Sequence, residues 1–188
     1  MLRSRIFKTA LFCFFIFLAV ATSYAYEDDG FGQSKKIESQ HFIIYYAPLL
    51  DLDMLTQQLN IGAGEAIIAE QPLVRGNDLG AMLDTLFSWV GKQLDMNLYS
   101  LKGNLKICKD GAQLAQVYNT IFGRNLKVQS FYISEYKTIY ISAEHFTKEI
   151  LAHEIAHMII SHYFVVAPPQ RAAEILAGYV EYQLRKSN

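Results

Sequence analysis

Hydrophobic and polar residues alternate in several short stretches of the chain, and these stretches predict β-strands. Segment 41–46 (HFIIYY) is rich in β-branched and aromatic residues and is followed by Pro48, which is typical of a largely covered strand. A second short strand is expected at 105–108. Segments 131–134 and 138–142 alternate with period two and are joined by three residues, so they predict a hairpin.

Longer segments carry their apolar residues at helical spacing. Residues 79–94 follow Asp78, and residues 111–122 lie between an N-cap residue, Asp110, and a C-cap residue, Gly123. Short helices are expected at 50–59 and 65–70, and two longer ones at about 147–163 and 170–185. These strands and helices predict one α+β domain, with a small, mostly antiparallel sheet packed on helices.

The first 25 residues have the pattern of a secretory signal peptide. Basic residues precede an apolar run at 10–21, and Ser23 and Ala25 provide small residues before an acidic stretch. This predicts cleavage after Ala25, a flexible leader at 26–40 and a domain at 41–188. The alternative is an uncleaved membrane anchor, but the run is shorter than the about 20 residues that a span needs. We therefore expect a secreted or periplasmic protein without a stable membrane span after cleavage, and a membrane-anchored form as the alternative.

Charge and cysteine content narrow the function classes. A net charge of −1 gives no sign of a surface that binds nucleic acid or an anionic membrane. Cys108 is the one cysteine after the signal segment, which excludes an internal disulfide in the mature chain. Its place in a short apolar strand predicts a buried, inert thiol.

His153, Glu154 and His157 form the pattern H-E-x-x-H within a strongly apolar helix. Because the histidines are four residues apart, both rings lie on one helix face and can bind one metal ion. Glu154 is expected to act as a general base on metal-bound water. The alternative is a chance recurrence of histidine. The apolar surroundings argue against it, because unpaired polar groups there cost on the order of several kcal/mol.

A catalytic zinc usually has three protein ligands, so a third is expected after His157. The prolines at 168–169 end one helix and begin another, and the two helices are expected to pack as an antiparallel hairpin. Positions equidistant from a centre between residues 165 and 166 then face each other. This count pairs His157 with Glu174.

Two other side chains compete with Glu174. Glu181 lies two turns further along nearly the same face, and the hairpin count places it opposite Ile150, too far from the metal. His162 is five residues past His157, which turns it about 140° away around the helix. Glu174 is therefore the expected third ligand.

With these residues the chain resembles the gluzincin metallopeptidases, in particular small single-domain members of the peptidase MA-like kind. The matching segments are 153–157 (HEIAH) and 168–181 (PPQRAAEILAGYVE), the second of which resembles a proline-led helix that carries the glutamate ligand. The resemblance is specific over about residues 131–182. It implies a zincin-like fold in which the HExxH helix and the next helix form a hairpin, zinc as cofactor, and an edge strand at 138–142 along the substrate cleft.

Two positions depart from the family's pattern. Ile175 stands where glycine is common, and Gly178 stands where an acidic partner of the metal ligands is often found. Loss of such a partner typically weakens metal affinity or activity about 10–100-fold. The hairpin count instead predicts that Gly178 allows a close backbone approach between the helices. The residue that stabilises an oxyanion stays open among Tyr163, Tyr179 and Tyr182.

The expected function is that of a secreted zinc-dependent peptidase, which hydrolyses a peptide or protein substrate through water activated by Glu154. The alternative is a catalytically weak or inactive zincin-like module that keeps zinc structurally and binds a peptide or protein partner. A structural zinc is normally closed by a fourth protein ligand. Neither Cys108, on a remote strand, nor His162 is placed to supply one, which favours hydrolysis.

Overall fold

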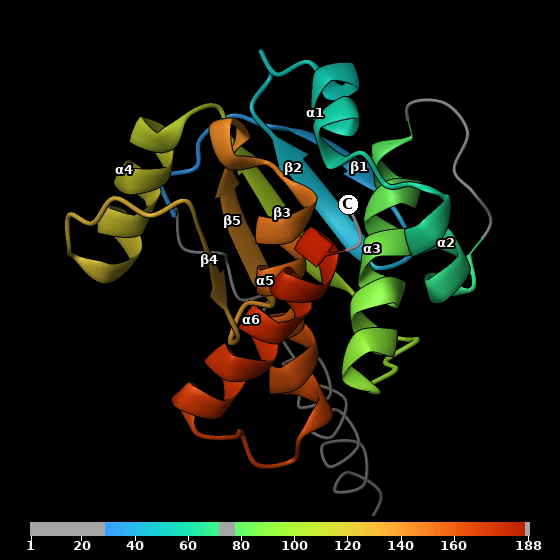
Figure 1. Ribbon diagram of the computed structural model, residues 1–188. Helices are drawn as coiled ribbons and strands as arrows, with labels where there is room; N and C mark the ends of the chain where they lie inside the picture. Colours follow the sequence, from blue (N-terminus) through green and yellow to red (C-terminus); the bar gives the residue numbers. More distant parts are fainter. Residues whose placement is uncertain (1–28, 72–77, 187–188) are drawn as a thin grey trace, which may run out of the picture.

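A computed structural model of the chain describes residues 29–71 and 78–186, and its centre is a five-stranded sheet. The strand order is β1-β2-β3-β5-β4 (Figure 1). The strands are β1 (Lys35–Glu38), β2 (Phe42–Tyr46), β3 (Gly103–Cys108), β4 (Ser130–Ile133) and β5 (Thr138–Ser142). All four expected strands are present, and β1 is an addition. The expected signal segment at 1–25 lies outside the described residues.

Six helices surround the sheet in the part of the chain that the structure describes. They are α1 (Leu52–Leu59), α2 (Ala63–Ala69), α3 (Leu79–Leu94), α4 (Gly111–Phe122), α5 (Lys148–Tyr163) and α6 (Gln170–Lys186). At the starts of α1, α3, α4 and α5, a cap residue accepts a hydrogen bond from a backbone N–H group of the first turn through its side-chain oxygen; the cap residues are Asp51, Asp78, Asp110 and Thr147. These caps explain why the sequence predicts the helix boundaries closely.

The sheet is mixed, so the expectation of a mostly antiparallel sheet is wrong. β2 pairs with β3, and β3 with β5, in parallel, whereas β1–β2 and β4–β5 are antiparallel. Parallel neighbours need a long connection, because the chain must return to the same end of the sheet before the next strand begins. A connection that contains helices is long enough to do this. Three helices separate β2 from β3, and α4 and β4 separate β3 from β5.

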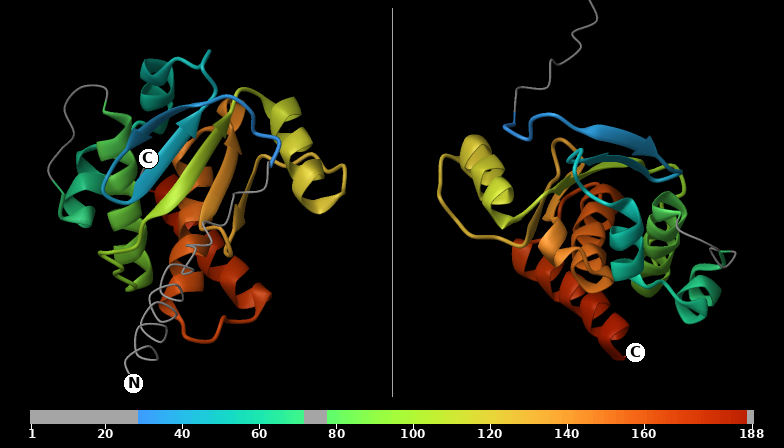
Figure 2. Two further views of the ribbon diagram at one scale, coloured as in Figure 1. Left: turned by 180° about the vertical axis from the view of Figure 1, so that it is seen from behind. Right: turned by 90° about the horizontal axis from the view of Figure 1, so that it is seen from above.

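The two faces of the sheet carry different cores. Alternate residues of the central strands pack on one face against α3 and α5; they are Phe42, Ile44, Leu105, Ile107, Ile139 and Ile141. On the other face, Cys108 and Tyr140 pack with Phe31 and α4. Burial raises the pKa of Cys108 to about 12, as expected for an inert thiol. Figure 2 shows α4 and residues 29–34 on the side of the sheet opposite α5 and α6.

The expected flexible leader at 26–40 is wrong for its described part. Asp29 and Phe31 are buried, and β1 belongs to the sheet. Asp29 accepts hydrogen bonds from Lys106 at 2.6 Å and from Tyr140 at 2.7 Å. These partners lie 77 and 111 positions away in the sequence, so no local pattern marks the segment as ordered.

α5 is the central helix and is buried around most of its circumference, which fits its apolar sequence. It packs against α3 and α6 (Figure 1). α6 runs antiparallel to α5, because Glu174 near its start contacts both histidines and Glu181, further along, contacts only His153. Within the described residues, none of the helices combines the length and apolar character that crossing a membrane requires.

Candidate metal site

α5 places His153 and His157 on one face. The helix begins after Thr147, whose side chain accepts a hydrogen bond from the backbone nitrogen of Ile150 at 3.4 Å. The Nε2 atoms of the two histidines lie 3.2 Å apart, and their rings meet at 70°. Both rings therefore present the same nitrogen to one point, as the four-residue spacing predicts.

α6 adds Glu174 to this pair. Its Oε2 atom lies 3.7 Å from His153 Nε2 and 3.6 Å from His157 Nε2. Ligand atoms that surround one tetrahedral ion at zinc distances are about 3.3 Å apart, so all three separations are close to those of a shared metal site. Among the described residues, these three form the one group of histidine, cysteine and acidic side chains placed to hold a metal ion.

Glu181 lies nearer to this group than the hairpin count predicts. It was expected opposite Ile150, yet its Oε2 atom is 3.3 Å from Nδ1 of His153. The count ignores that helical side chains lean towards the N-terminus of their own helix. In an antiparallel pair this tilt brings Glu181 and His153 together. Glu181 contacts the ring nitrogen that faces away from the ligand cluster, so it is not a fourth ligand.

His162 points away from the ligands, as its helical angle predicts. Its Nδ1 atom lies 2.9 Å from the carbonyl oxygen of Met158 and 3.4 Å from the hydroxyl of Tyr132. Cys108 belongs to the core on the other face of the sheet. Neither side chain can therefore close the site as a further ligand.

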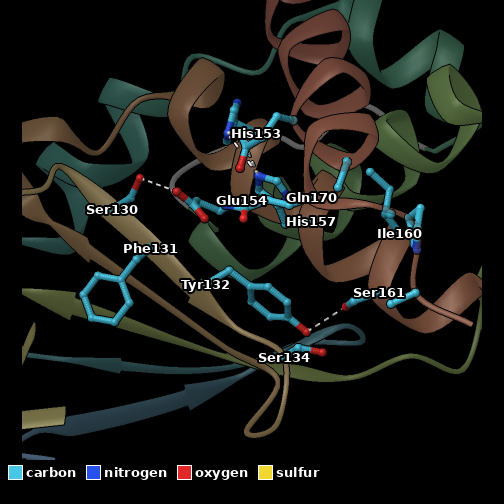
Figure 3. Close-up of a pocket in the computed structure, with 14 residues that line it drawn as sticks. Ser130, Phe131, Tyr132, Ser134, His153, Glu154, His157, Ile160, Ser161 and Gln170 are labelled. Atoms are coloured by element: carbon cyan, nitrogen blue, oxygen red, sulfur yellow. Dashed lines mark hydrogen bonds and ion pairs between the residues drawn. The ribbon is translucent and has the colours of Figure 1, made fainter. Parts of the chain in front are cut away.

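Glu154 is buried beside the histidines and is hydrogen-bonded to the sheet. It is only 7% exposed, and the Ser130 hydroxyl on β4 donates to Glu154 Oε1 at 2.6 Å (Figure 3). Burial raises the pKa of Glu154 above its ordinary value, although the Ser130 hydrogen bond and His153 oppose this. A carboxyl group with a raised pKa is suited to take up and release a proton near neutral pH.

Ser130 is the site residue that the sequence analysis misses. The strand was expected to begin at residue 131, one position later than β4 begins. Side chains alternate along β4: Ser130 and Tyr132 contact α5, whereas Phe131 stacks on Tyr140 of the other core, with ring centroids 4.7 Å apart. Alternation would have assigned Ser130 to the correct face. Only the packing of β4 on α5 pairs it with Glu154.

The protonation of His157 also suits a metal ligand. Burial lowers the pKa of the His157 ring, and the neighbouring His153 lowers it further, while Glu174 opposes both. The neutral ring is the form that binds metals. The site therefore favours the state that coordination needs.

A cleft of about 430 Å³ opens beside the ligand cluster. It is lined by β4, α5, the loop between α5 and α6, and α6, and the Tyr132 ring lies in it between strand and helix (Figure 3). Burial raises the pKa of the Tyr132 hydroxyl. The three tyrosines considered for an oxyanion role, Tyr163, Tyr179 and Tyr182, are 45–59% exposed and do not line the cleft.

The edge strand beside the cleft is β4, so the implied edge strand at 138–142 is wrong. That segment is β5, which lies between β3 and β4. The hairpin folds β4 to the outside of β5, and the outer edge of β4 pairs with no described strand.

Neither of the two positions in α6 that depart from the family's pattern is tightly packed. A Cβ atom added at Gly178 would meet no atom within 4 Å, so the expected close backbone approach at this glycine is wrong. Ile175 is 63% exposed. α6 instead packs through Ala177, Val180 and Leu184, which are buried.

Comparisons with known families, proteins and structures find no match. No protein-family model matches the chain, and neither curated proteins nor solved structures give a match.

Proposed function

We propose that this protein is a zinc-dependent peptidase with a zincin-like fold. His153, His157 and Glu174 are the proposed ligands, and Glu154 is the proposed general base. The observation that carries the proposal is the convergence of three ligand atoms at mutual distances of 3.2, 3.6 and 3.7 Å. A buried carboxyl group adjoins them and faces a cleft.

The donor set favours zinc over other metals. Two imidazole nitrogens and one carboxylate oxygen are a common ligand set of catalytic zinc, which keeps one position open. Magnesium and calcium prefer oxygen ligands alone. A zinc ion held by these residues supplies Lewis acidity, which polarises a carbonyl group and acidifies water.

Glu154 supplies the proton transfer. Ser130 holds one oxygen of its carboxyl group, so the other oxygen can take a proton from water in the cleft and later pass it to the leaving amine. The burial that raises the pKa of Glu154 brings its two protonation states closer in free energy at neutral pH. Both directions of transfer therefore become accessible.

An extended peptide is the proposed substrate because the outer edge of β4, beside the cleft, pairs with no described strand. Backbone groups of an edge strand can pair with an added strand, which would place a peptide along the cleft and across Glu154. Ile160, Ala167 and Pro168 form an apolar part of the lining. An uncharged side chain of the peptide fits this part best.

We also propose that the chain is exported through residues 1–25, from the signal pattern alone. Amino-terminal sequencing of the exported protein should then begin at Tyr26. An exported protein that still begins at Met1 would contradict cleavage and favour the membrane anchor.

Glu154→Gln tests the enzymatic proposal. Glutamine keeps the shape and can still accept the Ser130 hydrogen bond, but it removes the base. The variant should hold about one zinc ion per chain and lose hydrolysis about 10²–10⁴-fold. Zinc content and cleavage of a diverse peptide library measure both effects. A zinc-loaded wild type that cleaves no library member contradicts the peptidase and favours a binding module.

A further inference from the structure

Nδ1 of His153 is buried and has no aligned hydrogen-bond partner among the described residues. Among buried side-chain polar atoms of the described residues, only Trp89 Nε1 and His153 Nδ1 have no aligned hydrogen-bond partner. Nδ1 is the ring nitrogen opposite the one that faces His157 and Glu174. A buried polar atom without a partner costs free energy, so this nitrogen calls for an acceptor.

Glu181 is the acceptor within reach. Its Oε2 atom lies 3.3 Å from His153 Nδ1, in a contact that is short enough for a hydrogen bond but not aligned for one. The other oxygen of the same carboxylate accepts from Arg185, one turn later on α6. The Glu181 side chain is only 25% exposed, whereas that of Arg185 is 67% exposed. The carboxylate therefore lies between the exposed Arg185 side chain and the buried Nδ1 atom of His153.

We propose that Glu181 is the positioning residue of His153, and that Arg185 holds its carboxylate in place. The inference rests on the proposed metal site. A ring that binds a metal through Nε2 carries its proton on Nδ1, and a carboxylate that accepts a hydrogen bond from this N–H group orients the ring and strengthens Nε2 as a metal ligand.

In this proposal, Glu181 positions the His153 ring from a different place on α6 than the family resemblance implies. The resemblance puts an acidic partner at 178, which is glycine in this chain. Glu181 is three residues later, and it reaches the ring because both side chains lean towards each other across the antiparallel helices. The departure at Gly178 therefore does not leave His153 without a carboxylate neighbour.

Zinc affinity tests the inference without recourse to catalysis. Competition with a chromophoric chelator should show that Glu181→Ala weakens zinc binding about 10–100-fold and keeps one site per chain. Glu181→Gln should restore part of the affinity, because its amide oxygen can still accept from Nδ1. Arg185→Ala should have a smaller effect, and Glu135→Ala, in the exposed β4–β5 turn, should have none.

A ring-nitrogen NMR spectrum of the zinc-loaded protein separates orientation from general loosening. The His153 Nδ1 proton should be protected from exchange in the wild type and in Glu181→Gln, and lose this protection in Glu181→Ala. An unchanged spectrum and affinity in Glu181→Ala would overturn the inference while leaving the peptidase proposal intact.

The remaining outcomes also discriminate between the two proposals. Tight zinc binding that depends on Glu181, in a protein that cleaves no peptide, supports the inference and contradicts the peptidase. A wild type that binds no zinc overturns both.

Discussion

Two polar clusters lie on opposite faces of the sheet, a buried one around Asp29 and a partly exposed one of His153, His157 and Glu174, and they differ in how well their polar atoms are satisfied. Behind the sheet, Asp29 accepts from Lys106, Tyr140 and the backbone of Phe31 at 2.6, 2.7 and 3.1 Å. In the metal cluster, the Nε2 atoms of two histidines face each other at 3.2 Å, and the other nitrogen of His153 lacks an aligned partner.

The pKa values follow the same division. Burial alone would raise the pKa of Asp29, but hydrogen bonds from Lys106 and Tyr140 outweigh it, so the pKa is lowered. Burial raises the pKa of Glu154, and the Ser130 hydrogen bond does not offset it. The Asp29 cluster is thus complete as protein structure. In the candidate metal cluster, the proposed zinc ion would supply a shared partner for the ring nitrogens that face each other.

The largest loss of stability is expected when the Asp29 cluster is broken. Lys106→Met leaves the buried Asp29 carboxylate without its cation, which costs about 3–5 kcal/mol of unfolding free energy. Urea denaturation measures this. Lys36→Met, which removes an exposed ion pair with Glu38, is the control and should change stability far less. Equal effects of the two substitutions would mean that burial does not distinguish the pairs.

A smaller loss of stability, which appears only when zinc is bound, is expected from a substitution in the candidate metal cluster. The Glu174 side chain is half exposed, so Glu174→Ala should change the stability of the metal-free protein by no more than about 0.5 kcal/mol. It should remove the stabilisation by zinc, which is about 2.7 kcal/mol at a zinc concentration of 100 times Kd. Urea denaturation with zinc and with a chelator measures both. A wild type that zinc does not stabilise would show that the cluster needs no metal.

The smallest expected effect is on how the stability of the metal-free protein depends on pH. The pKa of Glu154 is raised above 4.5, so its contribution to stability is present below pH 4.5 and is lost as pH rises through the folded-state pKa. The pKa of Asp29 is lowered below 3.8, so its contribution is present above pH 3.8 and is lost as pH falls through the folded-state pKa.

Variants separate the two contributions. Glu154→Gln should flatten the loss of stability that sets in as pH rises above 4.5, and Asp29→Asn should flatten the loss as pH falls below 3.8. Chemical denaturation across pH, in the presence of a chelator, measures the two profiles. A Glu154→Gln profile that parallels the wild type would show that this carboxyl group is not strained by burial.

Local patterns in the sequence determined the elements and much of the ligand set. The periodicity and capping residues of α3, α4 and α5 place their boundaries to within about a residue. The four-residue spacing puts His153 and His157 on one face of a helix whatever surrounds it. These features depend on residues close in sequence, so backbone geometry alone carries the inference.

Only the tertiary structure decided which distant segments meet. It placed the parallel strands side by side, moved β4 to the edge beside the cleft, and joined Asp29 to Lys106 across 77 positions. It also brought the Ser130 hydroxyl into contact with Glu154, and the Glu181 carboxylate into contact with His153. The physical reason is that such contacts depend on strand order, helix tilt and side-chain direction, which arise when the whole core packs and leave no signal in a local pattern.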